Sequence, residues 1–226
     1  MFGRVGTLAA VLAIGLTPAG AAAAPRDVAA THSYLVAAYT ALHTTVTKWS
    51  SVEAAIHKLD QRFRAECPNV GAGSPQNEEE QKLSYEVAGA LWATGYRSQA
   101  KAVQAYVKTV GALKWSNPTL TRDAHRFTTE LHEMATLKVP DLCGDVRAWA
   151  AGGFGAVPAD TVRFVRHVEA LELKEVPRKL LAPYVAPSDR GLMARDERLA
   201  TQFEELEFTH GQNDWNELLE VLALNQ

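Results

Sequence analysis

The chain has 226 residues, of which 47% are hydrophobic, and its formal net charge is −3. This composition is far from that of disordered proteins and is sufficient for a substantial core. The mild charge, with both signs mixed along the chain, argues against a nucleic-acid binder, which usually carries a basic domain or stripe.

The first residues have the pattern of an export signal. Arg4 is followed by the apolar run VGTLAAVLAIGL, then by Pro18 and a series of small residues. This order is typical of a secretory signal peptide, and the run is shorter than the roughly 20 residues that span a bilayer. We expect a signal peptide over residues 1–24 and a secreted single all-α domain over residues 25–226, without a transmembrane segment. The alternative is an Ala-rich first helix.

After this leader, apolar residues recur at helical spacing in nearly every segment. In the first stretch they recur at steps of four and three: Leu35, Tyr39, Leu42, Val46 and Trp49. This spacing predicts a helix over about residues 27–66, with a kink near residues 49–51. A loop rich in Gly and Pro then separates it from a second helix that ends near residue 115.

The second helix contains Gly89 and Gly95 where its apolar stripe changes phase, which predicts a bend between them. Asn117 and Pro118 suit the cap and the first position of a third helix. Pro140 ends this helix.

Three further helices are predicted over residues 141–151, 159–175 and 189–208, with a separate final piece after Gly211. No long alternation of apolar and polar residues predicts a strand. Short loops favour antiparallel neighbours, so the sequence predicts an all-α antiparallel bundle of about five to six helices.

The chain has two cysteines, Cys67 and Cys143. An up–down–up order of the first three helices brings both toward one end of the bundle, and two cysteines in an exported protein are expected to pair. No C-x-x-C motif suggests redox chemistry, and two thiols alone are too few for a zinc site. We therefore predict one disulfide. The third helix is short, so the pairing requires the following helix to bridge the gap or the first helix to bend.

Two Glu–His pairs have the spacing of neighbours on a helix: Glu53 with His57, and Glu207 with His210. The second is the Glu-x-x-His step of di-iron bundles, which need two such steps and two further carboxylates. The sequence supplies one step, so these residues are candidate metal ligands beside the commoner alternative of solvated histidines.

A haem site needs one or two axial ligands inside an apolar bundle. His32 belongs to the apolar stripe with Leu35 and Tyr39, and Met134 belongs to the stripe of the third helix. The two are candidate cofactor ligands, although methionine on such a stripe is more often part of the core. No covalent haem motif is present.

The charged residues are unevenly distributed near the C-terminal end. Residues 195–220 are mainly acidic, whereas residues 163–179 carry a basic group: Arg163, Arg166, Lys174, Arg178 and Lys179. The two surfaces could pair, and a solvated helix surface is the commoner alternative.

Catalytic motifs are not found. GAGSPQ is not the G-x-S-x-G elbow, GGFGAVP lacks the third glycine of a dinucleotide loop, and no H-E-x-x-H is present. No catalytic residue is predicted. The sequence favours a non-catalytic binding or structural role outside the cytoplasm, with a protein or small-ligand partner. The alternatives are a metal- or haem-binding bundle and, last, an enzyme with a dispersed carboxylate–histidine site.

Overall fold

The computed structural model describes residues 23–66 and 78–221. Every regular element in these ranges is a helix, and no strand occurs in them, which confirms the all-α prediction. The α-helices are α1 (Pro25–Thr47), α2 (Trp49–Glu66), α3 (Glu78–Ser98), α4 (Ala100–Val110), α5 (Pro118–Thr136), α6 (Leu142–Gly152), α7 (Ala159–Ala170), α8 (Arg178–Leu181) and α9 (Arg190–Val221). Short 3-10 turns and irregular connections join these helices, and the last 3-10 turn, η3 (Pro187–Asp189), leads directly into α9.

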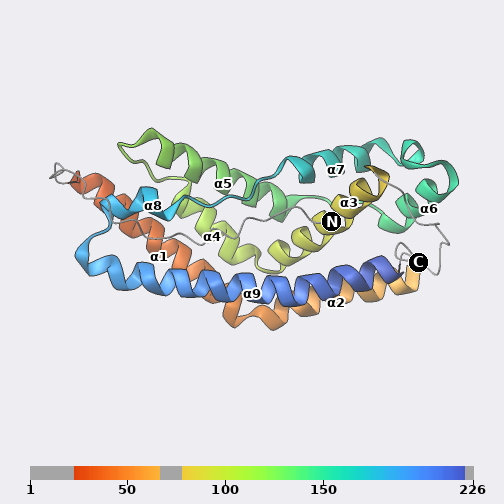
Figure 1. Cartoon of the computed structure of the whole chain (residues 1–226), viewed down its shortest axis with the longest axis horizontal. Coiled ribbons are helices and arrows are strands. Elements are labelled where there is room, and N and C mark those ends of the chain that lie inside the picture. The colour runs from red at the N-terminus through yellow and green to blue at the C-terminus, as the bar shows by residue number, and fades with distance from the viewer. Residues whose placement is uncertain (1–22, 67–77, 222–226) are drawn as a thin grey trace.

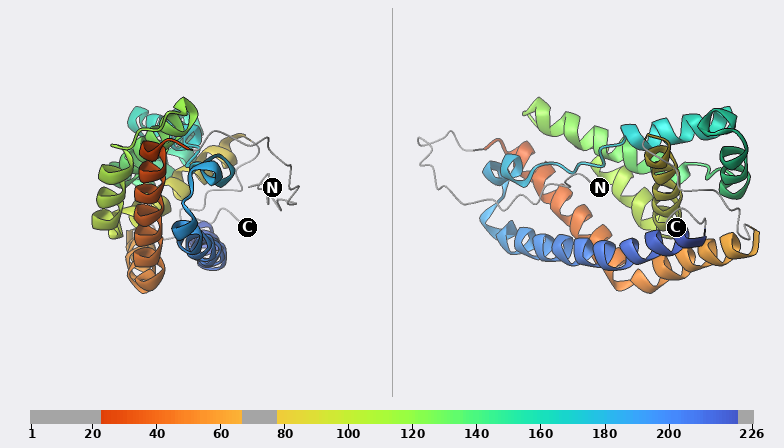
Figure 2. Two further views of the ribbon diagram at one scale, coloured as in Figure 1. Left: turned by 90° about the vertical axis from the view of Figure 1, so that its left-hand side faces the viewer. Right: turned by 45° about the vertical axis from the view of Figure 1, so that its right-hand side comes forward.

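The molecule is elongated, with α3 and α4 in its middle (Figure 1). The long helix α9 contacts both α1 and α2, which follow one another along one side. On the inner side, α4 packs between α1 and α5, and α3 packs between α2 and the pair formed by α5 and α7. In the right-hand rotated view, α9 (blue) again lies alongside α2 (orange) (Figure 2). The packing thus joins α2 to α3 and α4 to α5, which are consecutive in the chain, and also non-consecutive helices: α1 with α4 and α9, and α3 with α5 and α7.

The predicted kink in the first long helix lies at Lys48, between α1 and α2. Threonine hydroxyls in the preceding turns bond back to carbonyl oxygens four residues earlier, for example Thr44 to Thr40 at 2.7 Å and Thr47 to His43 at 2.6 Å. Such bonds compete with the helical ladder and often bend helices. A run of threonines before residue 48 therefore explains where the helix breaks.

The second predicted helix is interrupted at Gln99, so a single helix to residue 115 is wrong, and Gly89 and Gly95 both lie within α3. Gly89 instead permits close packing of α3 against α7. A Cβ at this position would lie 2.5 Å from Cγ2 of Val168 and 2.9 Å from the ring of Phe164. The glycine is needed for the space it leaves rather than for a change of backbone direction.

Two other predicted helix ends are also wrong. The helix expected over residues 159–175 ends at Ala170, and the backbone N–H of Leu173 donates to the buried Glu130 carboxylate at 2.8 Å. That bond holds the chain in a non-helical path toward α8. In contrast, α9 continues through Gly211 to Val221 without a break, because a single helical glycine costs only about 1 kcal/mol.

An aromatic cluster fixes α1 against α4 and α5. The ring of Tyr34 meets those of Tyr106 and Trp115 edge-on, at centroid distances of 6.5 and 6.3 Å. Phe127 of α5 meets Tyr106 in the same way at 6.0 Å. Trp115 also donates from Nε1 to Thr31 Oγ1 at 3.0 Å. Edge-to-face pairs of this kind add about 0.5–1.5 kcal/mol each beyond burial, so the cluster determines the position of α1.

The close packing at Gly89 predicts the result of a Gly89→Ala substitution. Val168 and Phe164 are themselves buried, so the added methyl group overpacks the α3–α7 contact, at a cost of about 1–3 kcal/mol. This exceeds the gain in helix propensity of up to about 1 kcal/mol. We expect urea unfolding to show a net loss of about 1 kcal/mol. Gly191→Ala is the control, because a Cβ there meets nothing within 4 Å. A Gly89→Ala protein as stable as the parent would contradict this account.

Candidate functional site

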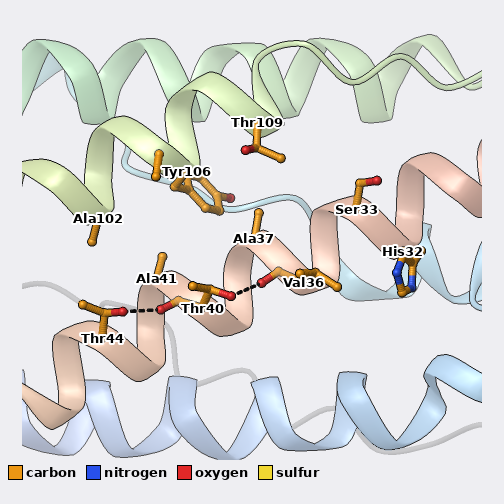
Figure 3. Close-up of a pocket in the computed structure, with 11 residues that line it drawn as sticks. His32, Ser33, Val36, Ala37, Thr40, Ala41, Thr44, Ala102, Tyr106 and Thr109 are labelled. Atoms are coloured by element: carbon orange, nitrogen blue, oxygen red, sulfur yellow. Dashed lines mark hydrogen bonds between the residues drawn. The ribbon is translucent and has the colours of Figure 1, made fainter.

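A surface groove of about 370 Å³ runs between α1 and α4 (Figure 3). Small-molecule sites usually have volumes of about 300–1,000 Å³, so the groove is of sufficient size for a small ligand. Eleven residues line it: His32, Ser33, Val36, Ala37, Thr40, Ala41 and Thr44 from α1, and Ala102, Ala105, Tyr106 and Thr109 from α4.

The groove exists because the two helices meet through large side chains inside and small ones outside. Tyr34 and Tyr106 fill the buried side of the α1–α4 contact. On the outer side, the facing positions include Ala37, Ala41 and Ala102, whose methyl groups are too short to close the space. The hollow is therefore a consequence of the residue types along the two helices.

Most of the groove wall is apolar, although its sequence includes threonines. Thr40 Oγ1 donates to the carbonyl oxygen of Val36, and Thr44 Oγ1 donates to that of Thr40, both at 2.7 Å (Figure 3). The two hydroxyl protons are thus used within α1 and are not offered to a ligand. Val36 is 42% exposed and is one of two large hydrophobic side chains exposed in the described part of the chain.

The other end of the groove is polar, and its main residue is His32. The Nδ1 atom of His32 lies 3.0 Å from Oδ1 of Asp189, the last residue of η3. The His32 side chain is 55% exposed, whereas that of Asp189 is only 11% exposed. The sequence placed His32 on the buried stripe of its helix. The structure buries Leu35 of that stripe together with Thr31 and Tyr34, but it leaves His32 at the rim of the groove.

The other candidate ligands lie apart from this groove. Met134 is fully buried on α5, and His57 is exposed on α2, where its Nε2 lies 2.9 Å from Nε2 of Gln61. Glu53 precedes His57 by one helical turn. The side chains of Glu207 and His210 lie outside the described residues, although α9 includes both positions. No group of three or more His, Cys, Asp or Glu side chains is arranged to hold a metal ion in the described ranges.

The first turn of α6 meets the end of α2 near one predicted cysteine. Cys143 is buried in α6, while Cys67 lies outside the described residues. Glu66, the last residue of α2, accepts a hydrogen bond at its carbonyl oxygen from Nη2 of Arg147 at 2.6 Å. The short helix α6 thus spans the distance between the end of α5 and the end of α2, as the predicted disulfide requires.

Part of the predicted acidic and basic surfaces does pair. Nη1 of Arg178 in α8 lies 2.6 Å from Oδ2 of Asp196 in α9, and the Asp196 side chain is 2% exposed. Burial raises the pKa of Asp196, and the positive charge of Arg178 opposes this shift. The pair joins the irregular stretch around α8 to α9, beside the aromatic cluster.

A second buried carboxyl group, Glu86 of α3, could not be recognised from the sequence. Its side chain is fully buried, and neither oxygen has a hydrogen-bond donor among the described residues. Burial, followed by the nearby carboxyl group of Asp145, raises the pKa of Glu86 to about 9. Asp145 is itself buried and accepts a hydrogen bond from Thr161 Oγ1 at 2.7 Å. Glu86 is therefore protonated at neutral pH.

Comparison with known protein families, with curated proteins and with solved structures finds no significant match. None of the helices in the described ranges is long and apolar enough to cross a membrane. The function is therefore inferred from the residues and the geometry of the groove.

The protonated Glu86 predicts a dependence of stability on pH. In the unfolded chain its pKa is close to 4.5, and in the folded protein it is about 9. Between these values the folded state holds a proton that the unfolded state has lost, so this contribution to stability is complete below pH 4.5 and is lost as the pH rises toward 9. The slope is up to about 1.4 kcal/mol per pH unit.

Glu86→Gln removes the titratable group and keeps a side chain of nearly the same shape. We expect the variant to exceed the parent in unfolding free energy at pH 8 by at least about 1 kcal/mol, with a smaller difference at pH 5, in urea titrations. Glu169→Gln changes an exposed residue of α7 and serves as the control. Parallel pH profiles for the parent and the Glu86→Gln protein would show that this group does not ionise as described.

Proposed function

We propose that this protein is an extracytoplasmic, non-catalytic binding protein whose α1–α4 groove holds an elongated apolar small molecule. The observation that carries the proposal is the groove itself, which combines a volume of about 370 Å³ with a largely apolar wall. Ligand sites are usually concave and mostly apolar, with a few polar groups that set orientation. This groove has that distribution, with its polar group at one end.

The shape of the groove favours a long ligand over a compact one. Its lining extends along α1 from His32 to Thr44. At a rise of 1.5 Å per residue, these twelve steps correspond to about 18 Å. A chain lying along this line contacts Val36, Ala37 and Ala41 on one side and the alanines of α4 on the other. Its burial would remove these exposed apolar atoms from water, at about 25 cal/mol per Å².

The polar residues favour binding rather than nucleophilic catalysis. His32 and Ser33 resemble parts of a catalytic set, but they are consecutive residues of α1. Side chains one residue apart on a helix do not face each other, so the imidazole is not aimed at this hydroxyl. The carboxylate of Asp189 therefore orients a histidine that is better suited to contact a ligand than to activate Ser33.

The proposal also includes export, an antiparallel bundle and a disulfide between Cys67 and Cys143. Export is supported by the signal-like leader and by the start of α1 at Pro25, directly after the predicted cleavage region. The disulfide is supported by the approach of the end of α2 to the start of α6, and by the finding that no cysteine in the described ranges is a free thiol. A bond at this point would clamp α2, α6 and the end of α5 together.

Ala105→Trp tests the groove as a binding site. Ala105 lines the groove and is exposed, so a tryptophan there fills the space without disturbing the core. We expect calorimetric titration with 1-decanol to show binding to the parent and at least about a tenfold loss in the variant, as steric exclusion of part of the chain predicts. Ala54→Trp places the same side chain on the exposed face of α2 and should leave affinity unchanged. Equal affinities in all three proteins, or no binding to any, would refute the groove as the site.

The disulfide is tested by thiol labelling of protein recovered outside the cell. We expect iodoacetamide to leave both cysteines unmodified until the protein is reduced, and then to label both, as measured by intact mass. The closed loop of about 77 residues should contribute roughly 4–5 kcal/mol, so Cys143→Ser should lower the unfolding temperature strongly. Complete labelling of the unreduced protein in denaturant would exclude the bond.

A further inference from the structure

We propose that the ligand of the groove is an amphiphile with a carboxyl head group, bound with its head at His32 and its apolar chain directed toward Thr44. This inference rests on the proposed function of the groove and adds the chemistry and the direction of the ligand. Three observations carry it: the way His32 is held, the change from polar to apolar lining along the groove, and the charge of the two helices.

The orientation of His32 leaves one ring nitrogen for a ligand. Nδ1 is 3.0 Å from the carboxylate of Asp189, which is buried and lies directly before the first residue of α9. The positive end of α9 favours the negative charge of Asp189. A carboxylate accepts only, so Nδ1 carries the proton and Nε2 is the nitrogen left for other contacts.

A carboxyl head group suits Nε2 in either charge state of the ring. When His32 carries both protons, Nε2–H donates to a ligand carboxylate, and the resulting contact is a charge-assisted hydrogen bond. When the ring is neutral, Nε2 accepts the acidic proton of the ligand. An alcohol brings no charge of its own: with the neutral ring its hydrogen bond is uncharged and roughly half as strong, and with the charged ring it lacks the attraction between opposite charges that a carboxylate adds.

The lining changes along the groove in the order that an amphiphile requires. Figure 3 shows Ser33 beside His32 at one end, and Ala41, Ala102 and Thr44 toward the other. The hydroxyl proton of Thr44 is held by the carbonyl oxygen of Thr40, so that end offers no donor to a ligand. A molecule that is polar throughout would lose hydrogen bonds to water along this wall, whereas an acyl chain would not.

The charges of α1 and α4 favour an anion. The exposed charged residues of these helices are all basic: Arg26 of α1, and Lys101 and Lys108 of α4. Their one acid, Asp27, is buried and accepts a hydrogen bond from the backbone N–H of Ser116 at 2.8 Å. The two helices therefore carry a net positive exposed charge, which attracts an anion to the groove as a whole.

The test compares decanoate with 1-decanol, which share a chain length and differ in the head group. We expect calorimetry to show decanoate binding to the parent protein about tenfold tighter than 1-decanol, the difference typical of a hydrogen bond to a charged group. His32→Gln should remove most of this preference by weakening decanoate about tenfold, with little effect on 1-decanol. Asp189→Asn should act in the same direction, because the amide no longer fixes the tautomer of His32.

His43→Gln is the matched control, since His43 is also exposed on α1 but does not line the groove. It should leave both affinities unchanged, and circular dichroism melting should show that each variant folds. Equal affinities for the two ligands, or a carboxylate preference that survives His32→Gln, would overturn the inference while the groove remains a binding site. Binding that Ala105→Trp leaves intact, or no binding of either ligand, would overturn the proposed function and this inference together.

Discussion

The contact between α1 and α4 is the constraint on which the described site depends. Tyr34 and Tyr106 are bulky and buried, and their edge-to-face packing keeps the two helices at a separation that alanine cannot span. On the outer side of the same contact, the helices present Ala37, Ala41 and Ala102. A larger side chain at any of these positions would close the groove, and a smaller pair inside would let the helices approach. Core packing and the shape of the surface thus have one cause.

Two of the buried carboxyl groups in the described ranges, those of Asp196 and Glu86, are accommodated in different ways. Asp196 is paired with Arg178, so its negative charge is compensated within the fold. Glu86 has no hydrogen-bond partner within residues 23–66 and 78–221, and burial keeps it protonated next to Asp145. Removal of one partner from a buried ion pair leaves an uncompensated charge, whereas a protonated acid becomes costly only when it ionises. The stability of the region around α8 therefore depends on the ion pair between Arg178 and Asp196. The stability of the region where α3, α6 and α7 meet depends on Glu86 remaining protonated.

Sequence periodicity was sufficient for the helices and insufficient for their junctions. The recurrence of apolar residues at every third or fourth position predicted α1, and the Asn117–Pro118 pair predicted the start of α5. The side chain of Asn117 indeed accepts a hydrogen bond from the backbone N–H of Thr119 at 3.0 Å. These signals are local. The role of Gly89 and the end of α7 are set by Val168 and Glu130, which belong to other parts of the chain. A single sequence shows that a glycine is present, but not what packs against it.

The groove was missed for the same physical reason. Its lining consists of ordinary helix residues, and neither Ala102 nor Thr109 carries a motif. His32 was selected because it is a histidine near an apolar stripe, yet its position depends on Asp189, which is 157 residues later in the chain. Glu86 looked like any charged residue of an exposed helix face. Long-range neighbours decide which polar residues become functional candidates, and residue type alone does not.

The threonines of α1 connect the groove to the kink that ends the helix. A hydropathy reading treats Thr40, Thr44 and Thr47 as one polar face. The structure shows that each hydroxyl bonds to its own helix, which removes the donors from the groove wall and weakens the regular ladder near Lys48. The apolar end of the groove at Thr44 consequently lies just before the break between α1 and α2. Replacement of these threonines by valine would keep the groove wall apolar but would remove the hydrogen bonds from their hydroxyl groups to the helix carbonyls. The same residues therefore contribute to the groove through their methyl groups and to the kink through their hydroxyl groups.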